Sequence, residues 1–425
     1  MIVQGRTGRR SGWESAWFTV NQRCLRDWNL VEMNTITLHS QRLRPFLDRR
    51  RLVDTALRLI EVPSRTGEAG AVSDRLAEIL TADGFQVERP EGGHAASPAV
   101  AVRFGGGQPG RVLQFDGHLD TVHLPFVPPR EEGGRLLGSG SSDMKGGIAA
   151  AVEALRALRD ADALPGGSIL LTAHDLHEAP WGDGSQLDRL IAEGYVGDAV
   201  LIPEPLHDIL PVVGKGSATW KVTLRREGPP VHEVMRPPHE PSVIAAGAVL
   251  VARLAALSAR LAAHPDPVCG PATVFVGQFH SGEIFNQYPQ DCMLEGTRRW
   301  LPGAEIGAVR HEFQEILDTI AHDWSLSVAC EWRPIRDAFS LDQADALVSS
   351  FRRSYEAIAG GPIATGPKPF VDDGSSFWAH GRIAAITHGP RAGGQHTLNE
   401  WVDVDDLVRV AHLYALTAMA YCAEG

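Results

Sequence analysis

The stretch RVLQFDGHLDTV, residues 111–122, begins as an apolar run typical of a buried strand and ends in a group of polar residues. Further along the chain a helical pattern begins at about Met144, and apolar runs at 168–173 and 198–204 enclose a second helical pattern at 185–194. Strands that alternate with helices in this way are typical of a domain built on a mainly parallel sheet. The sequence therefore predicts an α/β domain with polar residues at the ends of its strands.

The pattern changes between residues 213 and 332. Alternating strand-like runs and two long helical patterns follow the order β-α-β-β-α-β there, which is typical of a ferredoxin-like domain. The α/β pattern resumes after this segment. We therefore expect an α/β domain in two parts, residues 45–212 and 333–425, with the ferredoxin-like domain of residues 213–332 inserted between them.

Length and composition exclude several classes of protein. A chain of 425 residues predicts two domains. Its 52 acidic and 40 basic residues give a net charge of −12 without a basic block, so nucleic-acid binding is not expected. No apolar run approaches the roughly 18 residues of a membrane span, so we expect no membrane contact. Five scattered cysteines without CxxC spacing indicate reduced thiols in a cytoplasmic protein.

Residues 1–32 differ from the rest of the chain. They carry basic residues and three tryptophans, and they show no hydrophobic periodicity. A continuous apolar region and a small-residue cleavage site are both missing, which is not typical of a signal peptide. We expect translation to begin at Met33, with residues 1–32 as a non-native or disordered extension.

The polar residues of the opening stretch are the first candidates for a site. His118 and Asp120 are two apart on a predicted strand and therefore face the same side. His118 could bind a metal there while Asp120 braces its other ring nitrogen. Asp143 directly precedes a helix, where a carboxylate could bridge two cations, although Asp is also a common helix N-cap.

Three more candidates follow predicted strands or lie in loops: Glu178, Glu204 and His396. With His118 and Asp143 they place two His and three carboxylates at the carboxyl ends of successive elements, the edge where α/β sheets bind ligands. Such a set can hold two divalent cations, which together activate water and polarise a carbonyl. We expect two such ions, zinc in the first place, with cobalt or manganese as alternatives.

Five motifs carry a resemblance to a known family: GHLDTV, GSGSSDMKGG, IPEP, FNQYPQDCMLEGTRRWLPG and QHTLNEW. Their order and approximate spacing over about residues 50–420 resemble the metallopeptidases that include aminoacylase, acetylornithine deacetylase, succinyl-diaminopimelate desuccinylase and glutamate carboxypeptidase. The resemblance implies a catalytic α/β domain with an inserted ferredoxin-like lid that commonly forms homodimers.

The resemblance also assigns the ligands. It implies that His118 and Glu178 bind one metal, with Asp143 as the bridge. Glu204 and His396 would be the remaining terminal ligands, with His396 on the second metal.

The family usually has a Glu-Glu pair where this chain has His177-Glu178. The first Glu is the general base and the second a ligand, so His177 stands in the position of the base. His177 could still shuttle protons near neutral pH, but two adjacent cations should lower its pKa. An alternative alignment makes Glu178 the base and Asp175 or Asp183 a ligand.

Further residues match family positions outside the metal site. By resemblance, His232 would reach the partner subunit's site and donate to the oxyanion, while Asn286 and Arg299 would bind the substrate carboxylate and orient the tetrahedral species. Arg suits this role because its planar fork binds carboxylate bidentately. Arg298 is the neighbour most easily confused with Arg299, because strand alternation turns one of the two away.

Three residues have weaker assignments. Asp373, before Gly374, would brace the site or cap a helix. Trp181 would line a pocket, and His174 would be a satisfied polar residue.

The resemblance predicts a metal-dependent amidohydrolase that cleaves a small N-acyl amino acid or a dipeptide-like amide with a free carboxylate. Because His177 replaces the usual base, two alternatives stay open. One is altered chemistry, such as amide formation, transfer or cyclisation. The other is a metal-binding or ligand-binding protein without turnover.

Overall fold

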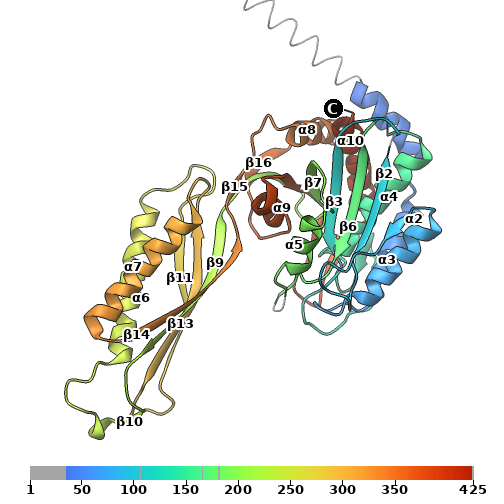
Figure 1. The fold of residues 1–425 in the computed structure, drawn as a ribbon. Coiled ribbons are helices and arrows are strands. Elements are labelled where there is room, and N and C mark those ends of the chain that lie inside the picture. Colours follow the sequence, from blue (N-terminus) through green and yellow to red (C-terminus); the bar gives the residue numbers. More distant parts are fainter. Residues whose placement is uncertain (1–34, 106, 165, 180–181, 424–425) are drawn as a thin grey trace, which may run out of the picture.

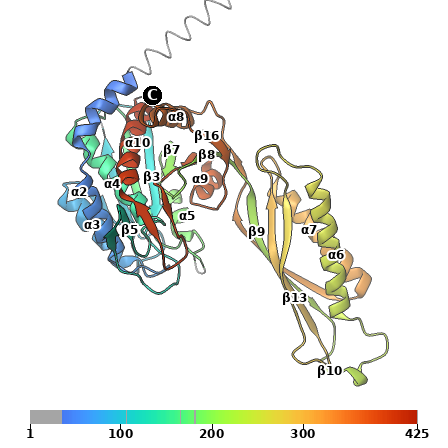
Figure 2. The same ribbon diagram turned by 180° about the vertical axis from the view of Figure 1, so that it is seen from behind.

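The computed structural model describes residues 35–105, 107–164, 166–179 and 182–423. The expectations for residues 1–32 and for Trp181 lie outside these ranges. Two lobes are evident: an α/β lobe formed by both ends of the described chain, and an elongated lobe formed by its middle (Figures 1 and 2).

The α/β lobe is built on a six-stranded sheet in the order β1-β2-β6-β3-β7-β17. The four strands from β6 to β17 run parallel, whereas β1 and β2 pair antiparallel at one edge. The mainly parallel α/β sheet predicted from the sequence is thus confirmed. The strands are β1 Val87–Glu88, β2 Val100–Gly105, β3 Val112–His118, β6 Ser168–His174, β7 Ala199–Ile202 and β17 Ala384–Thr387.

Helices cover this sheet and bury its apolar side chains. Helices α4 and α10 pack against each other and against β3, while α9 packs against β7, β17 and α5. Leu113 and Phe115 of β3 are fully buried among them. The helices of the lobe are η1 Arg44–Phe46, α2 Arg49–Ile60, α3 Gly70–Ala82, α4 Lys145–Asp160, α5 Ser185–Ala192, α8 Ala346–Ala359, α9 Gly374–Gly381 and α10 Val404–Cys422.

Two small sheets that the sequence did not indicate flank the main one. Their orders are β18-β19-β5-β4 and β15-β8-β16. The first sheet holds the loop of His396 between two of its strands, and the second lies where the chain passes between the lobes. Their strands are β4 Arg130–Glu132, β5 Arg135–Leu137, β8 Ile209–Gly214, β15 Phe339–Ser340, β16 Ala364–Pro367, β18 Ala392–Gly393 and β19 Trp401–Asp403.

The elongated lobe is a four-stranded antiparallel sheet, in the order β11-β13-β9-β14, with two helices on one face (Figure 1). Along the chain its main elements follow one another as β-α-β-β-α-β. A short pair of strands, β10 with β12, extends one end of the lobe. The elements are β9 Gly216–Arg225, β10 Val231–His232, η2 Glu233–Met235, α6 Val243–Ala262, β11 Thr273–Ser281, β12 Gln287–Tyr288, β13 Asp291–Trp300, α7 Ile306–Trp324 and β14 Ser327–Arg336.

Helix α6 corrects one expectation from the sequence. Its 20 residues, with a mean hydropathy of 1.7, are long and apolar enough to span a membrane by length and composition. In this fold, however, its apolar face packs on the four-stranded sheet and buries Leu250, Leu254 and Leu257. Arg253 and Arg260 on the same helix form ion pairs with α7. Packing on the sheet therefore accounts for one face of α6, about a third of its apolar window, and the rest of the window is not buried in this chain.

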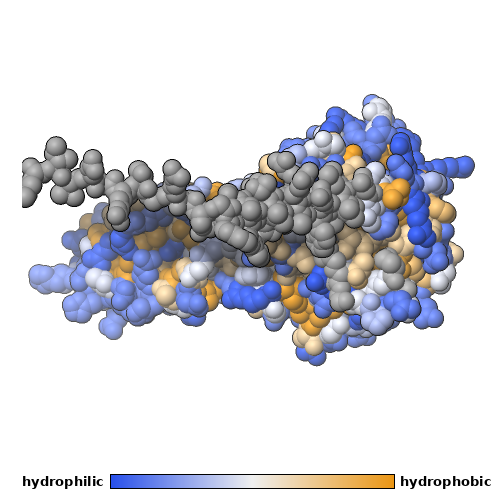
Figure 3. Space-filling model, turned by 90° about the horizontal axis from the view of Figure 1, so that it is seen from above, coloured by the Kyte–Doolittle hydropathy of each residue, from blue (hydrophilic) through white to orange (hydrophobic). Residues whose placement is uncertain are grey.

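The coloured part of the face seen in Figure 3 is largely hydrophilic, with separate hydrophobic areas. Large exposed apolar side chains of the elongated lobe include Phe275, Ile284, Phe285 and Ile335.

Candidate metal centre

Five polar side chains meet at the carboxyl edge of the parallel strands. His118 is the last residue of β3, and Glu204 follows β7, its hydrogen-bonded neighbour. Glu178 lies on the loop after β6, and Asp143 stands just before α4. His396, from the loop between β18 and β19, closes the group. The structure therefore brings together all five predicted metal ligands, although they come from widely separated parts of the sequence.

The distances divide these side chains into two groups that share Asp143. His118 Nε2 lies 3.2 Å from Asp143 Oδ1 and 3.3 Å from Glu204 Oε1. His396 Nε2 lies 3.2 Å from Glu178 Oε2 and 3.5 Å from Asp143 Oδ2. The two oxygens of Asp143 thus face different histidines, which is the arrangement that a bridging carboxylate requires.

The donor set fits divalent metal ions. His118 Nδ1 is 3.1 Å from the Asp120 main-chain oxygen, so it carries the ring proton and leaves Nε2 toward the carboxylates. Among the described residues, His118 Nε2 and Asp143 Oδ1 are buried without a hydrogen-bond partner. Acceptor atoms that converge in this way need a cation between them, and imidazole with carboxylate is a typical ligand set for zinc and related metals.

The closest contacts differ from the predicted pairing of the ligands. We expected His118 to share a metal with Glu178, and His118, Asp143 and Glu178 do form one group of metal-binding geometry in the described chain. The carboxylates nearest to His118 are those of Asp143 and Glu204, and Glu178 lies nearest to His396, so the pairing stays a prediction. Sheet order alone does not decide between the two pairings, because β3 lies between β6, which Glu178 follows, and β7, which Glu204 follows.

The pKa values of the metal-free site show how strongly these groups interact. Burial lowers the pKa of His118, but Asp143 and Glu204 outweigh it and hold the pKa well above its ordinary value. Hydrogen bonds to Asp143 and Glu178 raise the pKa of His396 to about 10. Burial, with the nearby Asp143, raises the pKa of Glu204 to about 8. Without metal the site therefore holds protons, which a metal must displace.

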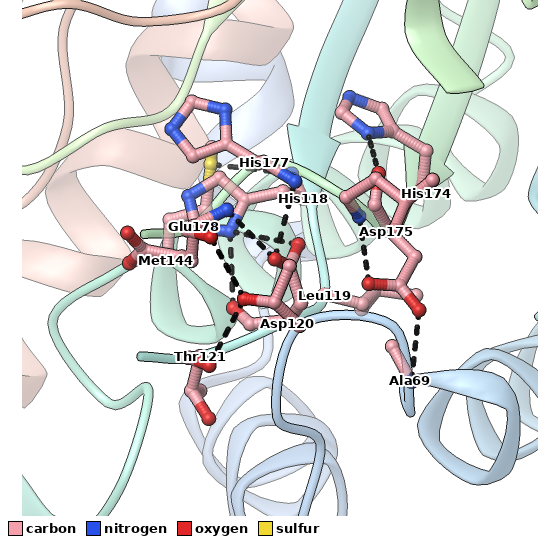
Figure 4. Close-up of polar contacts among 12 residues, drawn as sticks. Ala69, His118, Leu119, Asp120, Thr121, Met144, His174, Asp175, His177 and Glu178 are labelled. Carbon is pink, nitrogen blue, oxygen red and sulfur yellow. Dashed lines mark hydrogen bonds and ion pairs between the residues drawn. The ribbon is translucent and has the colours of Figure 1, made fainter. Parts of the chain in front are cut away.

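Asp120 braces the site through its carboxylate. Its Oδ2 accepts hydrogen bonds from the main-chain N–H groups of His177, at 3.1 Å, and Glu178, at 2.8 Å (Figure 4). The Asp120 Oδ1 lies 3.6 Å from His118 Nδ1, whereas the Asp120 main-chain oxygen lies 3.1 Å from the same nitrogen. Asp120 thus fixes the loop that carries Glu178 as well as the ring of His118.

His177 lies beside the metal ligands with its ring held from behind. Its ring stacks on that of His118, with centroids 4.0 Å apart and planes 1° from parallel (Figure 4). Its Nδ1 is 2.7 Å from Asp373 Oδ1, and its Nε2 is 3.9 Å from Glu204 Oε1. Burial lowers the pKa of His177 and Asp373 raises it, and the result is a pKa of about 9. The fall in pKa beside two cations stays a prediction for the metal-loaded site.

A second polar cluster lies behind His177, and the sequence reasoning missed it. His174 Nε2 lies 3.3 Å from Asp373 Oδ2 and 3.5 Å from Asp116 Oδ2, and all three side chains are buried. We expected His174 to be a satisfied polar residue and Asp373 to brace the site. Polar residues alternate with other residues at the ends of β3 and β6, and this alternation was the signal that could have indicated the cluster. Asp116 of β3 and Thr172 of β6 are register partners there.

Asp175 and Asp183, the ligands expected from the alternative alignment, have other partners. The Asp175 carboxylate accepts hydrogen bonds from the N–H groups of Gly67 and Ala69 (Figure 4). Asp183 accepts one from the N–H of Ser185, at the start of α5. Neither carboxylate belongs to the groups of metal-binding geometry in the described chain.

The site opens into a cavity of about 420 Å³. A cavity of this size holds a small amide substrate. Its lining comprises Asp143, His177, Glu178, Glu204, Pro205, Phe370, Val371, Gln395 and His396.

Comparison with known proteins places this geometry in a family. The model of peptidase family M20/M25/M40 matches residues 115–420. The chain belongs to this family.

Curated relatives of this M20 chain include two desuccinylases. A succinyl-diaminopimelate desuccinylase of Methylorubrum extorquens (strain PA1) is 28% identical over 389 residues, which cover 85% of this chain and 97% of the relative. One from Methylorubrum populi is 36% identical over 189 residues, and that match spans 40% of this chain and only 49% of the relative.

Solved structures share the M20 fold. Aminopeptidase PepT from Bacillus cereus has a TM-score of 0.74 at 20% identity, covering 88% of this chain and 99% of its own. The YXEP protein of Bacillus subtilis is described as a dinuclear metal binding peptidase of the M20 family. It has a TM-score of 0.65 at 15% identity, and the match covers 89% of this chain and 99% of the YXEP chain. Family membership and these relatives make the M20 chain a metal-dependent hydrolase of amide bonds.

The remaining predicted residues lie on the elongated lobe, outside the cavity lining of the M20 chain. His232 is exposed on β10, and the half-buried Asn286 directly precedes β12, with His232 Nε2 2.9 Å from Asn286 Nδ2. On β13, Arg298 is buried and paired with Glu312 of α7, whereas Arg299 faces the opposite side of the sheet. Strand alternation thus leaves Arg299, and not Arg298, available for an anion.

Proposed function

We propose that this chain hydrolyses the amide bond of a small N-acyl amino acid or dipeptide-like substrate that bears a free carboxylate. The observation that carries the proposal is the convergence of two histidines and two further carboxylates around a shared Asp143, at the edge of a cavity sized for a small substrate. The names of the curated relatives and structural neighbours, desuccinylases and peptidases, support the same bond type.

We assign the ligands according to the closest contacts. His118 and Glu204 would hold one divalent ion, His396 and Glu178 would hold the other, and Asp143 would serve both. Bound ions at this position supply Lewis acidity to the scissile carbonyl and to an attacking water. Zinc is the first choice for this set, and cobalt or manganese are alternatives.

His177 moves the proton in this proposal. Its Nδ1–H donates to Asp373, which fixes the ring. Bound metal ions would lower its pKa from about 9 and so free the Nε2 lone pair toward the cavity. From there Nε2 takes a proton from the attacking water and delivers it to the leaving amine. The main-chain N–H groups of His177 and Glu178 both donate to Asp120, and these hydrogen bonds fix the position of the His177 ring relative to the ligand Glu178.

The elongated lobe supplies the outer contacts of the substrate. Arg299 binds the free carboxylate, and His232 with Asn286 stabilises the oxyanion of the partner subunit's site in a homodimer. Support for the second role is the exposure of His232, and the position of both residues outside the metal-site cavity lining of their own chain. A cytoplasmic location is expected from the scattered thiols.

The test is amine release from a panel of N-acyl amino acids and dipeptides, with zinc, cobalt or manganese added. Release that a chelator abolishes is the expected result, and the best panel member identifies the acyl group. Protein that is shown to hold two metals and releases no amine from any member overturns the hydrolase proposal.

A second candidate function rests on His177. A base that becomes positively charged when it takes a proton differs from the family's Glu, and it could serve amide formation, transfer or cyclisation. The same panel, supplemented with free amines and followed for new amide products, tests this candidate.

A further inference from the structure

A second group of ligand-type side chains lies on the same face of the sheet as the metal centre. Asp116 is two residues before His118 on β3, and His174 ends β6, where it is the register partner of His118. Residues two apart on a strand share a face, so Asp116 points to the same side as His118. Asp373, directly before α9, completes the group. We call Asp116, His174 and Asp373 the inner cluster.

The inner cluster is buried, and its converging atoms lack partners. Asp116 is fully buried, and His174 and Asp373 are 2% and 5% exposed. In the described part of the chain, His174 Nε2, Asp116 Oδ2 and Asp373 Oδ2 are buried without a hydrogen-bond partner. One ligand atom from each residue lies within 4.8 Å of the other two. Buried polar atoms without partners are costly, so three that converge favour a common ligand.

The charges of the inner cluster favour a cation. Asp116 and Asp373 bring two carboxylates into the core, and neither pairs with a Lys or Arg among the described residues. Their ion-pair partners are histidines, His174 for both and His177 for Asp373. Two buried carboxylates beside a neutral imidazole leave two negative charges, which one divalent cation balances.

The distances distinguish a metal ion from a shared proton. A charge-assisted N–H···O bond is about 2.7–2.9 Å long. The hydrogen bond from His177 Nδ1 to Asp373 Oδ1 has that length, at 2.7 Å. In contrast, His174 Nε2 lies 3.3 Å from Asp373 Oδ2 and 3.5 Å from Asp116 Oδ2. Ligand atoms about 2.0–2.2 Å from a tetrahedral ion are about 3.3–3.6 Å from one another, so these separations fit the ion.

The ring of His174 is oriented as a ligand. Its Nδ1 is 3.1 Å from the Asp175 main-chain oxygen (Figure 4). That contact places the ring proton on Nδ1 and leaves Nε2 free to bind a cation. His118 in the metal centre is held in the same way, by the main-chain oxygen of Asp120. Metal-binding histidines typically donate their other ring N–H to such an acceptor.

The two carboxylates are oriented in a corresponding way. The Thr172 hydroxyl donates to Asp116 Oδ1, and His177 Nδ1–H donates to Asp373 Oδ1. Each carboxylate therefore uses its Oδ1 in a hydrogen bond and turns its unpartnered Oδ2 to the inner cluster. Hydrogen bonds of this kind to the outer oxygen commonly orient carboxylate ligands of metals.

We propose that the inner cluster binds a third divalent metal ion, held by Asp116, His174 and Asp373. An imidazole nitrogen with two carboxylate oxygens suits zinc, with cobalt or manganese as alternatives. None of the five ligands of the metal centre belongs to the inner cluster, so this ion is separate from the other two. Because Asp373 also accepts the hydrogen bond from His177, the third ion would hold in place the carboxylate that fixes the His177 ring.

The metal content of the purified full-length protein tests the proposal without any turnover. Protein that is loaded with zinc and dialysed should hold three ions per chain by mass spectrometry of the elements. Asp116→Asn and His174→Gln should each hold one ion fewer than the wild type. The difference between wild type and variant is decisive, so the result does not depend on whether the hydrolase proposal holds. Equal metal content in the wild type and both variants overturns the proposal.

Two further variants separate the inner cluster from the metal centre and from general destabilisation. His396→Ala removes a ligand of the metal centre, and adding Asp116→Asn to it should remove one more ion. Asp406→Asn is the matched control, because Asp406 is a buried carboxylate that pairs with Arg409 and belongs to no group of metal-binding geometry in the described chain. We expect Asp406→Asn to keep all its metal. If it loses as much as Asp116→Asn, the assignment to the inner cluster is overturned.

Cobalt titration of the metal-free protein supplies a second measurement, read from the visible absorption of the bound ion. The wild type should saturate at one equivalent more than Asp116→Asn. Saturation of both proteins at the same equivalent would mean that a protonated His174, and not a metal ion, balances the two carboxylates, and it would overturn the proposal.

Discussion

At the scale of single residues, His177 and Asp373 act as one unit. The 2.7 Å contact fixes one ring nitrogen, so any replacement of His177 also faces the Asp373 carboxylate. We expect His177→Glu to lower hydrolysis by about 10-fold, because two adjacent buried carboxylates repel each other and the new base stays protonated. Steady-state kinetics of the metal-loaded variant measures this loss.

A double-mutant cycle supplies the control for His177→Glu. Asn at position 373 removes the negative charge, so His177→Glu with Asp373→Asn should recover activity that His177→Glu alone loses. Additive losses in the cycle would contradict the proposed coupling. If hydrolysis appears only with Glu at position 177, the wild-type chain belongs to the alternative functions.

The pKa values of the metal ligands predict how the stability of the metal-free protein changes with pH. Both folded pKa values are raised, to about 10 for His396 and about 8 for Glu204, from 6.5 and 4.5. The folded state therefore holds protons that the unfolded chain has released, and stability falls as pH rises through these windows. His396 loses its contribution between about pH 6.5 and 10, and Glu204 between about 4.5 and 8.

Melting temperatures between pH 6 and pH 9, with and without a chelator, measure this effect. The metal-loaded protein should lack the decline, because the metals replace the protons, and metal binding should release protons into the buffer. Parallel curves for the two forms would show that these side chains do not bind the metal.

The five candidate ligands were predictable because each one follows a strand, precedes a helix or lies in a recognisable motif. The cluster of Asp116, His174 and Asp373 was not, since it depends on strand register and on a loop about 200 residues away in the sequence. The convergence of Lys215, Arg299, Arg336 and Lys368 between the lobes was not predictable for the same reason. These side chains line one cavity only when both passages between the lobes are in place.

At the scale of elements, the site depends on how closely α4 approaches the end of β7. A Cβ at Gly147 would lie 1.9 Å from the main-chain oxygen of Pro203, next to the ligand Glu204. Gly147→Ala should therefore move α4 away from this segment, cost about 1–3 kcal/mol of stability and weaken metal binding. Denaturant unfolding and metal titration measure the two effects.

Gly307→Ala is the matched control for Gly147→Ala. Gly307 lies in helix α7, and a Cβ there meets nothing within 4 Å. Ala in place of an unconstrained helical Gly should stabilise the protein by about 0.5–1 kcal/mol without affecting the metals. Similar stability changes in the two variants would refute the close-approach argument.

Element length explains which parts of the fold were predictable. Helix α4 begins at Lys145, where a helix was expected from about Met144, because its 16 residues carry a clear periodicity. Strands β18 and β15 have two residues each, too few for an alternating pattern. The two small sheets therefore follow from tertiary pairing alone, and one of them holds the loop of His396.

At the scale of the whole molecule, the separation of the lobes makes the second subunit part of the proposed site. Strand β10, which carries the exposed His232, lies at the end of the elongated lobe far from the α/β lobe (Figure 2). Neither His232 nor the half-buried Asn286 lines the metal-site cavity of its own chain. A role for His232 in the partner subunit's site accounts for that placement. A strictly monomeric variant should accordingly bind metal and hydrolyse poorly, whereas full activity in a monomer would refute the role.

Subunit complementation tests the same arrangement without a monomeric variant. His232→Ala lacks the donated histidine, and Glu178→Gln lacks a metal ligand, so each homodimer should be nearly inactive. In a mixed dimer one site combines an intact metal centre with an intact His232 from the other chain. Random exchange should restore about a quarter of the wild-type activity per site, since half of the dimers are mixed and one of their two sites is complete.

The two variants must be refolded or co-expressed together, because exchange between stable dimers is slow. The control is a mixture of His232→Ala with wild-type protein. If His232 acts in its own subunit, mixing His232→Ala with Glu178→Gln restores nothing, because no chain then carries both groups. Recovery on mixing therefore requires that His232 serve the neighbouring metal centre, which would make the dimer the catalytic unit.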